Sequence, residues 1–391
     1  MPNPSTLNLS RVLRIVWINP GISRIEIAKK LNLDKSTITN IIARLMKQAY
    51  IVTMSEGEAS PQGGRKPVGL AINTAFGVVL GMEITTDKVM VSGMNLQGHS
   101  LFMRSFLLQR ENERLEQVFE RALKDVRQDI EDTHMPLIGI GLGLSGIINP
   151  ITGEIIQSIP LDIHQRYPLL ERIRHLVDVP IFIDNDANCC CWEEMVCSGR
   201  DRYDNFLFVL AEDRFHSVSL ESRRIGFAVG LGLVIHGEVL RGLDFSAGEF
   251  QSVLWKSGNT SQFSFTDDVM AEIEKYPDAI NDTIQELAVN VAFLTNVMDV
   301  SRVVLGGGLE KYGDLPLQIF AQEIEKNWSY PQQGSCEICM VQNGEYAVAI
   351  GAAAMFLEKL FTVPRTSSDQ ENLKPDELTG FEILDSCKIE R

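Results

Sequence analysis

A group of polar side chains that could bind a ligand directly follows an apolar run at residues 181–183. The group comprises Asp184, Asn185, Asp186 and Asn188, and a helix-compatible pattern resumes after it. Open α/β sheets bind ligands at the carboxyl ends of their strands, which is where this group would lie. A carboxylate accepts two hydroxyl protons and an amide both donates and accepts, which suits adjacent hydroxyls. We therefore expect Asn185 and Asp186 to hold a polyhydroxylated ligand, with Asp184 and Asn188 bracing the turn into the helix.

A glycine-rich stretch lies earlier in the chain. Gly141, Gly143 and Gly146 satisfy the GxGxxG spacing of dinucleotide-binding folds. That fingerprint also requires a helix that starts within the glycines and an acidic residue about 20 positions further on. An Asn-Pro pair and a Thr-Gly pair follow Gly146 and signal turns instead of a helix. The pattern therefore argues against a dinucleotide site.

The cysteines indicate neither a disulfide framework nor a metal site. Seven are present, an odd number, and three of them form the triplet 189–191. Cys336 and Cys339 have CxxC spacing, but no second pair or nearby histidine pair completes a tetrahedral zinc site. We expect the triplet to be buried thiols, Cys336 and Cys339 to be an exposed pair, and neither a metal nor another cofactor to be bound.

Length and composition are those of a soluble globular protein with more than one domain. The chain has 391 residues, of which 45% are hydrophobic and 23% charged, and this allows two or three domains. The longest nearly uncharged apolar run, residues 137–148, is too short to span a bilayer. The N-terminus has no basic segment followed by an apolar core. We expect a cytoplasmic protein without a membrane partner.

Charge is distributed unevenly along the chain. Residues 1–70 hold ten basic and four acidic residues, a net charge of +6, whereas the remainder holds 26 basic and 48 acidic residues, a net charge of −22. A basic N-terminal segment on an acidic body suggests a nucleic-acid-binding head. A basic solvated surface without a partner is the alternative, so the head needs a motif to support it.

Three helices and two strands are predicted in this head. They are helices at residues 9–17, 23–31 and 35–49 and strands at residues 50–54 and 68–72. Ser23 and Glu26 have the spacing of a capping box for the second helix, and Asp34 is placed to cap the third. Two short helices joined by a tight turn form a helix-turn-helix, and the two strands with a basic tip between them make it a winged helix.

The third helix and the wing carry the predicted DNA contacts. Short hydrogen-bonding groups and cations on that helix suit phosphates and base edges in a major groove, and Arg65 in the wing tip could enter a narrow A·T-rich minor groove. The predicted DNA-binding residues are Lys35, Ser36, Thr37, Thr39, Asn40, Arg44, Arg65 and Lys66. Units of three helices also dock proteins, but the basic charge and the basic wing together favour DNA.

Strand-like and helix-like runs alternate in the body, residues 75–363, which fits a mixed α/β protein of two lobes. The strand-like runs are residues 77–80, 88–94, 101–107, 137–144, 181–184, 206–210, 227–235 and 303–305. The helical runs are residues 112–132, 169–176, 188–197, 278–299, 315–327 and 346–360. Residues 364–391 form an acidic tail that we expect to be disordered or loosely docked, with Phe381 and Leu384 as its anchors.

The head sequence SRIEIAKKLNLDKSTITNIIARLMKQAYI, followed by GGRKP, resembles the repressor branch of the ROK family (repressors, open-reading-frame proteins and sugar kinases). The likeness runs from about residue 7 to about residue 361. It implies a winged helix-turn-helix over residues 1–74 and, over the body, the actin-like ATPase or sugar-kinase (ribonuclease H-like) fold. One lobe would comprise residues 75–190 plus 346–363 and the other residues 191–345, with the ligand in the cleft between them.

The resemblance also implies which residues bind sugar. They are Asn185 and Asp186 for two adjacent hydroxyls, Glu249 as a further sugar-binding acid, and Ser145 and Gly146 in the loop that lines the pocket. Ser252 stands where the family has a histidine that contacts sugar and binds zinc in most members, and residues 256–268 lack the zinc cysteines. We therefore expect no structural zinc. For the aromatic residues at 250, 255, 263 and 265, core packing is favoured over stacking on a sugar.

The loops that bind phosphate in the family's kinases are altered here. Where the kinases carry an Asp-x-Gly-Gly-Thr hairpin, residues 83–87 read Glu-Ile-Thr-Thr-Asp, which adds side chains and negative charge where a triphosphate would lie. Phe227 replaces a threonine of the second loop, whereas glycines 306–308 of the adenosine loop are kept. Asp186 could serve as the base of a kinase, but with two loops altered we expect no catalytic residue.

The sequence therefore predicts a sugar-responsive DNA-binding transcriptional regulator, a repressor released from its operator by a bound sugar. We expect a homodimer or homotetramer on an A·T-rich imperfect palindrome, because paired recognition helices must lie about one duplex turn apart. An active ATP-dependent sugar kinase with a regulatory head is the alternative, and a head used for protein docking is a further one. An activator in place of a repressor, and a sugar that acts as co-repressor in place of inducer, are further alternatives.

Overall fold

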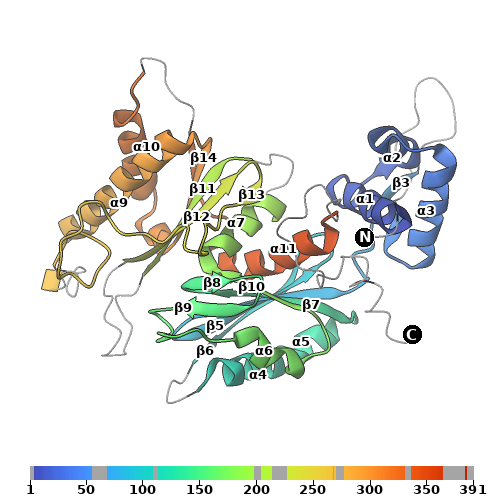
Figure 1. The fold of residues 1–391 in the computed structure, drawn as a ribbon, viewed down its shortest axis with the longest axis horizontal. Helices are drawn as coiled ribbons and strands as arrows, with labels where there is room; N and C mark the ends of the chain where they lie inside the picture. Colours follow the sequence, from blue (N-terminus) through green and yellow to red (C-terminus); the bar gives the residue numbers. More distant parts are fainter. Residues whose placement is uncertain are drawn as a thin grey trace.

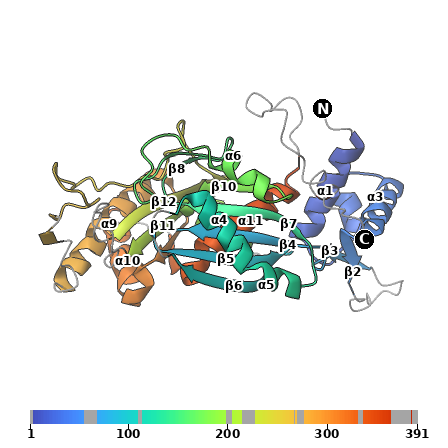
Figure 2. The same cartoon turned by 90° about the horizontal axis from the view of Figure 1, so that it is seen from below.

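The computed structural model describes residues 4–54, 68–108, 113–197, 204–213, 227–266, 268–269, 277–330, 336–363 and 384. In these ranges the chain forms a small N-terminal head and a larger body with two five-stranded sheets. The head lies at one end of the molecule, and α9 (Pro277–Met298) and α10 (Leu315–Lys326) lie at the other (Figures 1 and 2). Within the described ranges, no helix combines the length and apolar character needed to cross a bilayer.

The head consists of three helices and a three-stranded antiparallel sheet with the order β1-β3-β2. Its elements are α1 (Pro4–Ile18), β1 (Ile22–Ser23), α2 (Arg24–Leu31), α3 (Lys35–Lys47), β2 (Ile51–Thr53) and β3 (Gly69–Ile72). The capping box is confirmed, because Ser23 Oγ accepts from the Glu26 amide and Glu26 Oε2 accepts from the Ser23 amide at 2.8 Å. The prediction that Asp34 caps α3 is wrong for its side chain, which makes no capping hydrogen bond from the N-cap position.

The first sheet of the body has the order β10-β7-β4-β5-β6. Its strands are β4 (Val78–Ile84), β5 (Lys88–Asn95), β6 (Ser100–Leu107), β7 (Leu137–Leu144) and β10 (Ile181–Asn185). Because β4, β7 and β10 are parallel, their carboxyl ends meet at one edge. One face is covered by α4 (Leu115–Asp125), α5 (Arg127–Asp132) and α6 (Leu169–Ile173) (Figure 1). The prediction of one helix over residues 112–132 is wrong, because Val126, with ψ of 2°, separates α4 from α5.

The second sheet has the order β13-β12-β11-β14-β15 and packs against α9 and α10. Its strands are β11 (Phe206–Asp213), β12 (Phe227–Ile235), β13 (Glu238–Val239), β14 (Arg302–Gly307) and β15 (Glu337–Met340). The short strands β13 and β15 were not predicted. Cys339 lies in β15 and Cys336 directly before it, and both are half-buried, so the prediction of an exposed pair is wrong. Arg302 donates to Cys339 Sγ at 3.0 Å.

Two helices, α7 (Asp186–Cys197) and α11 (Ala347–Phe361), lie between the sheets (Figure 1). α11 approaches the first sheet so closely that a Cβ added to Gly81 or Gly141 would lie 1.8 or 1.9 Å from the carbonyl oxygen of Ala349 or Ala352. α7 packs on α11 and on β11 and β12 of the second sheet. The cysteines at 189–191 on α7 are fully buried, which confirms the prediction of buried thiols.

Glu193 of α7 gives this central core a pH dependence. The side chain is 3% exposed, and Asn343 donates to its Oε1. Burial, together with the carboxylates of Glu194 and Glu310, raises the pKa of Glu193 from 4.5 to about 8. The folded protein therefore holds this proton more tightly than the unfolded chain, and stability falls as the pH rises from about 4.5 to about 8.

Glu193→Gln is expected to remove this loss, since glutamine keeps the oxygen that accepts from Asn343 but cannot ionise. The free energy of unfolding should rise by up to about 5 kcal/mol at about pH 9 and by about 2 kcal/mol at about pH 6. Urea denaturation at both pH values measures the difference, with the exposed Glu171→Gln as control. A gain of equal size at both pH values would contradict the assignment.

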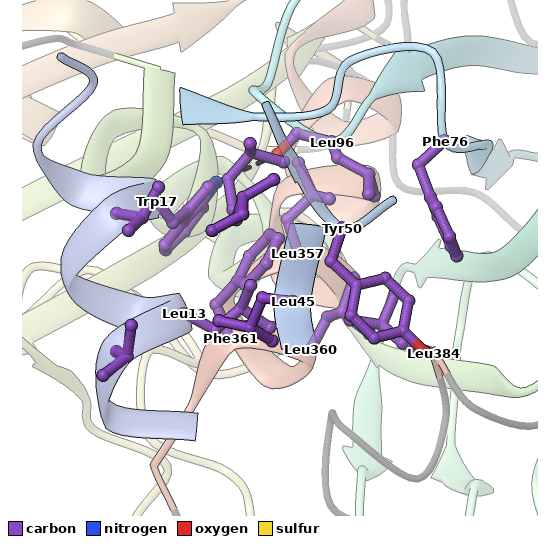
Figure 3. Packing of buried hydrophobic residues seen from close by; sticks show 14 of the residues in the cluster. Leu13, Trp17, Leu45, Tyr50, Phe76, Leu96, Leu357, Leu360, Phe361 and Leu384 are labelled. Carbon is purple, nitrogen blue, oxygen red and sulfur yellow. Dashed lines mark hydrogen bonds between the residues drawn. The ribbon is translucent and has the colours of Figure 1, made fainter. Parts of the chain in front are cut away.

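The head is joined to the body by a buried contact that we call the head–body seam (Figure 3). Trp17 of α1 is 6% exposed, and its ring stacks on Phe361 of α11 with 4.7 Å between centroids. Its Nε1 donates to the carbonyl oxygen of Leu96 at 3.0 Å. Arg14 of α1 pairs with Glu358 of α11 at 2.6 Å. The apolar core of the head is therefore continuous with that of the body.

Leu384 is the part of the tail that the structure describes, and it also lies in the head–body seam. It is 1% exposed and belongs to the same apolar cluster as Leu13 and Leu360 (Figure 3). This burial confirms Leu384 as an anchor of the tail. Phe381, the other predicted anchor, lies outside the described residues.

Candidate functional site

Asn185 ends β10 and Asp186 begins α7, so this predicted pair lies at the edge where β4, β7 and β10 end. Asn185 Nδ2 donates to the carbonyl oxygen of Gly146 at 2.9 Å, and its Oδ1 accepts from the Asn188 amide at 3.2 Å. Asp186 is 7% exposed, and its Oδ1 accepts from the Ala187 amide at 2.8 Å. The structure thus brings Asn185, Asp186 and Gly146 together.

Asp184 stabilises the turn between β10 and α7 and also links the two sheets of the body. Its Oδ1 accepts from the Asn185 amide at 2.9 Å and from Asn188 Nδ2 at 3.0 Å, which confirms the predicted bracing role. Its Oδ2 pairs with Arg241 Nη2 at 2.6 Å, and Asp184 is fully buried. Arg241 follows β13 in the second sheet, and the sequence did not identify it because no local pattern marks its partner.

The glycine-rich stretch is divided between a strand and a turn. Gly141 and Gly143 lie in β7, and Gly146 follows it and leads into β8 (Ile147–Asn149). No helix starts there, which confirms that the dinucleotide fingerprint is not met. Gly146 has φ of +113°, and an added Cβ would lie 2.5 Å from the carbonyl oxygen of Gln157 in β9 (Glu154–Gln157). This close contact of the two backbones therefore requires glycine at position 146, next to Asn185. Ser145 beside it is 7% exposed.

Glu249 reaches the same edge from the other sheet. It is exposed, and its backbone bridges Gly230 of β12. A Cβ built on Gly230 would lie 3.5 Å from Ala187 Cβ and 3.9 Å from Asp186 Oδ1. Gly230 therefore lies between Asp186 and the segment that carries Glu249, the two acids predicted to bind sugar.

A cavity of about 510 Å³ adjoins Glu249. Its lining residues are Glu249, Phe250, Gln251, Trp255, Asn259, Thr260, Ser261 and Gln262. Of the predicted sugar-binding residues, only Glu249 lines it. Phe250 and Phe263 pack against each other at 5.7 Å in the core, as expected, and Phe265 packs at its edge. Trp255 instead lines the cavity, with its Nε1 bonded to the Ser261 carbonyl at 3.0 Å.

Ser252, at the position of the family's zinc-binding histidine, has surroundings that do not suit a metal ion. Ser252 is 4% exposed, and its hydroxyl accepts from Asn290 Nδ2 at 3.2 Å and from the Leu254 amide at 3.1 Å. Hydroxyl and amide groups are poor zinc ligands. Among the described residues, no group of three or more histidine, cysteine or acidic side chains is placed to hold a metal ion.

The hairpin that binds phosphate in the kinases is filled by its own side chain. Thr85 Oγ1 accepts from the Lys88 amide at 3.1 Å and from the Asp87 amide at 3.4 Å, and it donates to Asp87 Oδ1 at 2.8 Å. A phosphate needs such amides to be available. This hairpin does not fit a phosphate ligand.

Packing also accounts for the two other segments that correspond to nucleotide-binding loops of the kinases. Phe227 is 3% exposed and meets the ring of Tyr312 at 5.9 Å, and Gly226 before it lies outside the described residues. Gly307 has φ of +84°, and an added Cβ would lie 2.6 Å from the carbonyl oxygen of Ala211. A close contact between β14 and β11 thus requires glycine at Gly307, whether or not a nucleotide binds.

The exposed face of α3 carries the polar residues predicted to contact DNA. Lys35, Ser36, Thr39, Asn40 and Arg44 are exposed, Thr37 is half-buried, and Arg65 and Lys66 of the wing lie outside the described residues. The inner face holds Ile38, Ile42 and Leu45, each fully buried. Ala43 and Lys47 are exposed on the polar face as well. The helical period could have identified them, and the small Ala43 would allow close approach to a groove.

Comparison with known proteins gives separate matches for the body and for the head. Residues 79–251 match the ROK family and residues 6–53 match the MarR family. A xylose repressor from Caldicellulosiruptor bescii is 22% identical over 404 residues, an alignment that covers 92% of this chain and 97% of the relative.

Solved structures share the fold. The crystal structure of a ROK family transcriptional regulator, a homologue of the E. coli MLC protein, has a TM-score of 0.72 at 18% identity and covers 91% of this chain and 96% of that chain. A ROK family glucokinase from Streptomyces griseus, in complex with glucose and AMPPNP, has a TM-score of 0.54 at 16% identity and covers 71% of this chain and 99% of that chain. The prediction of a ROK-type α/β body behind a winged helix is confirmed. Residues 79–251 thus match the ROK family, and a segment that matches the MarR family precedes them at residues 6–53.

Proposed function

We propose that this protein is a sugar-responsive transcriptional repressor that leaves its operator when a sugar binds in the cleft. The observation that carries the proposal is that α11 contacts both the head and β7, close to the edge of the first sheet where Asn185 and Asp186 lie. Near its start, Val348 lies against Gly143 of β7, where an added Cβ would come within 2.6 Å of it. At its end, Phe361 stacks on Trp17. A change in the cleft is therefore transmitted to the head through one helix.

The sugar would be held by the group at the edge of the first sheet. Asn185 and Asp186 would bind adjacent hydroxyls, Glu249 a further hydroxyl, and Ser145 and Gly146 would line the pocket with their backbone. These groups match the chemistry of a neutral polyol, since carboxylates accept hydroxyl protons and the amide serves both ways. The ligand shifts DNA binding only if it binds more tightly to the conformation that releases DNA.

The head would bind DNA through α3 and the wing. Lys35, Ser36, Thr37, Thr39, Asn40 and Arg44 on α3, with Arg65 and Lys66 in the wing, are the proposed contacts. Since paired recognition helices must lie roughly 34–36 Å apart, we propose an even homo-oligomer on an A·T-rich imperfect palindrome. A small rotation of each head would then misplace the helices in the groove.

Fluorescence anisotropy with a labelled operator, identified by selection from random DNA, tests the sugar site. D-xylose, D-glucose and a panel of other monosaccharides are added to the full chain on this DNA, and at least one should release it. Asp186→Asn should raise the concentration needed for release about 10- to 100-fold, because a charge-assisted hydrogen bond is lost. Asp162→Asn, at an exposed position, is the control. Unchanged release with Asp186→Asn would refute the site.

The same assay tests the head. Lys35→Ala should weaken operator binding and lower the slope of log affinity against log salt by about one, as expected for the loss of one phosphate contact. Lys124→Ala, on the exposed surface of α4, is the matched control and should change neither. Failure to enrich any DNA sequence would instead favour a head that docks a protein.

An ATP-dependent sugar kinase with a regulatory head is the second candidate, favoured by the fold shared with the glucokinase. Against it stand the hydroxyl of Thr85 in the phosphate hairpin and the buried Phe227. We propose that the protein has no kinase activity. Release of ADP above background with any sugar of the panel would revive the kinase.

A further inference from the structure

Glu83 is a buried acid at the same edge of the first sheet as Asn185 and Asp186, and the proposed function gives it no role. It lies at the carboxyl end of β4, in register with Gly143 of β7 and Met90 of β5. The side chain is 3% exposed, and its Oε2 has no hydrogen-bond partner among the described residues. A buried polar atom left without a partner costs about 1–3 kcal/mol. A partner from outside the chain would remove that cost.

Carboxylates from three other parts of the fold face Glu83. Asp87 lies in the β4–β5 hairpin, Asp186 begins α7, and Glu212 belongs to β11 of the second sheet. Lys88 is a cation that faces it, and Lys88 is itself held in an ion pair at 2.7 Å. Burial first, and then these negative charges, raise the pKa of Glu83 well above its usual value. The buried thiols of α7 also face it.

These surroundings discriminate between ligands by charge. A carboxyl group in its acid form donates a hydrogen bond, which a sugar oxygen can accept. A phosphate would be repelled by the carboxylates of Asp87, Asp186 and Glu212, and repulsion between like charges is strongest at the buried Asp186. The hairpin amides that might compensate are already bonded to Thr85.

We propose that Glu83 is a further ligand-contacting residue, whose buried carboxyl donates a hydrogen bond to a sugar oxygen, and that the cleft accepts sugars without a phosphate group and rejects their phosphate esters. This inference rests on the proposed function. The segment that corresponds to the phosphate-binding hairpin of the kinases, residues 83–87, would then line the sugar pocket. Because Glu83 and Glu212 come from different sheets, a hydroxyl compound between them would contact both halves of the body.

Isothermal titration calorimetry on the full chain provides the test. The probes are D-xylose, D-glucose and D-fructose, each compared with its terminal phosphate ester. We expect at least one free sugar to bind and its ester to bind at least about 100-fold more weakly, a difference of about 2.7 kcal/mol. An ester that binds as tightly as its parent sugar would overturn the inference and leave the repressor function standing. If none of the three free sugars binds, the inference fails, whereas the proposed function is decided by the wider panel in the anisotropy assay.

Two substitutions assign the effect to Glu83. Glu83→Gln keeps the shape and a donor, so affinity for the free sugar should stay within about threefold, whereas Glu83→Ala should weaken it about tenfold or more. Affinity in the wild type should fall at alkaline pH, because ionisation of Glu83 removes the donor, and Glu83→Gln should abolish this dependence. Unchanged sugar affinity in Glu83→Ala, or an equal pH dependence in Glu83→Gln, would overturn the assignment. Glu171→Gln is the remote control.

Discussion

Asp184→Ala is expected to lower the free energy of unfolding by about 3–5 kcal/mol, the cost of removing one partner of a buried ion pair. Asp184 is fully buried, and its Oδ2 lies 2.6 Å from Arg241 Nη2. The substitution leaves the guanidinium without its anion and also removes the acceptor for Asn188 Nδ2. Urea denaturation followed by circular dichroism measures the loss.

A double-mutant cycle separates the ion pair from the local hydrogen bonds. Asp184→Asn keeps an acceptor for Asn188 but loses the charge, and Arg241→Met keeps an apolar stem beside Trp192, whose ring lies 5.9 Å from the guanidinium. The double variant should be less destabilised than the sum of the two single variants by about 1–3 kcal/mol. Strict additivity would show that the pair contributes nothing to holding the two sheets together.

Trp17→Ala is expected to destabilise the protein by about 3–5 kcal/mol, in the range for a buried aromatic residue replaced by alanine. The indole fills the head–body seam, stacks on Phe361 and donates to the Leu96 carbonyl. Loss of the indole should also uncouple DNA binding from the response to sugar. The variant should still bind the operator, but sugar should no longer release the DNA. Thermal unfolding and the anisotropy assay measure the two effects. Trp328→Ala, at a half-buried position after α10, is the control.

Trp17→Phe tests the same seam with less disruption. Phenylalanine can keep the stacking on Phe361 but cannot donate to Leu96, so the expected loss is about 1 kcal/mol plus a modest packing term. Sugar-dependent release should then survive with a weaker response. Full release in Trp17→Ala would contradict the role of the head–body seam in coupling, even if the stability loss is as expected.

Local patterns predicted most of the fold. Helical spacing located α7, α9, α10 and α11, and the capping box at Ser23 located the start of α2, because these signals depend on neighbours in sequence. The break at Val126 and the short strands β13 and β15 were missed, since a single residue's ψ angle or a two-residue pairing is set by tertiary contacts.

The candidate site was predicted only where a motif carried it. Asn185 and Asp186 stand together at a strand end, and a ligand edge follows from that position. Arg241 was missed because its partner lies 57 residues away and neither residue shows periodic spacing. The sequence also could not show that Trp17 leaves the core of the head to pack on α11, because an apolar residue on a helix does not specify which surface it covers.

The contact of Gly81 and Gly141 with the backbone of α11 has a mechanical consequence. Where no side chain separates helix and strand, the helix cannot slide or roll by repacking side chains, so it moves as a rigid lever with the sheet edge. A helix of 15 residues is about 22 Å long, and a tilt of about 10° would displace its far end by about 4 Å. That exceeds the spacing of about 3.4 Å between successive base pairs. If sugar binding closes the cleft as proposed, α11 would enlarge that small movement, at Phe361, to the scale on which a recognition helix would lose its register with DNA.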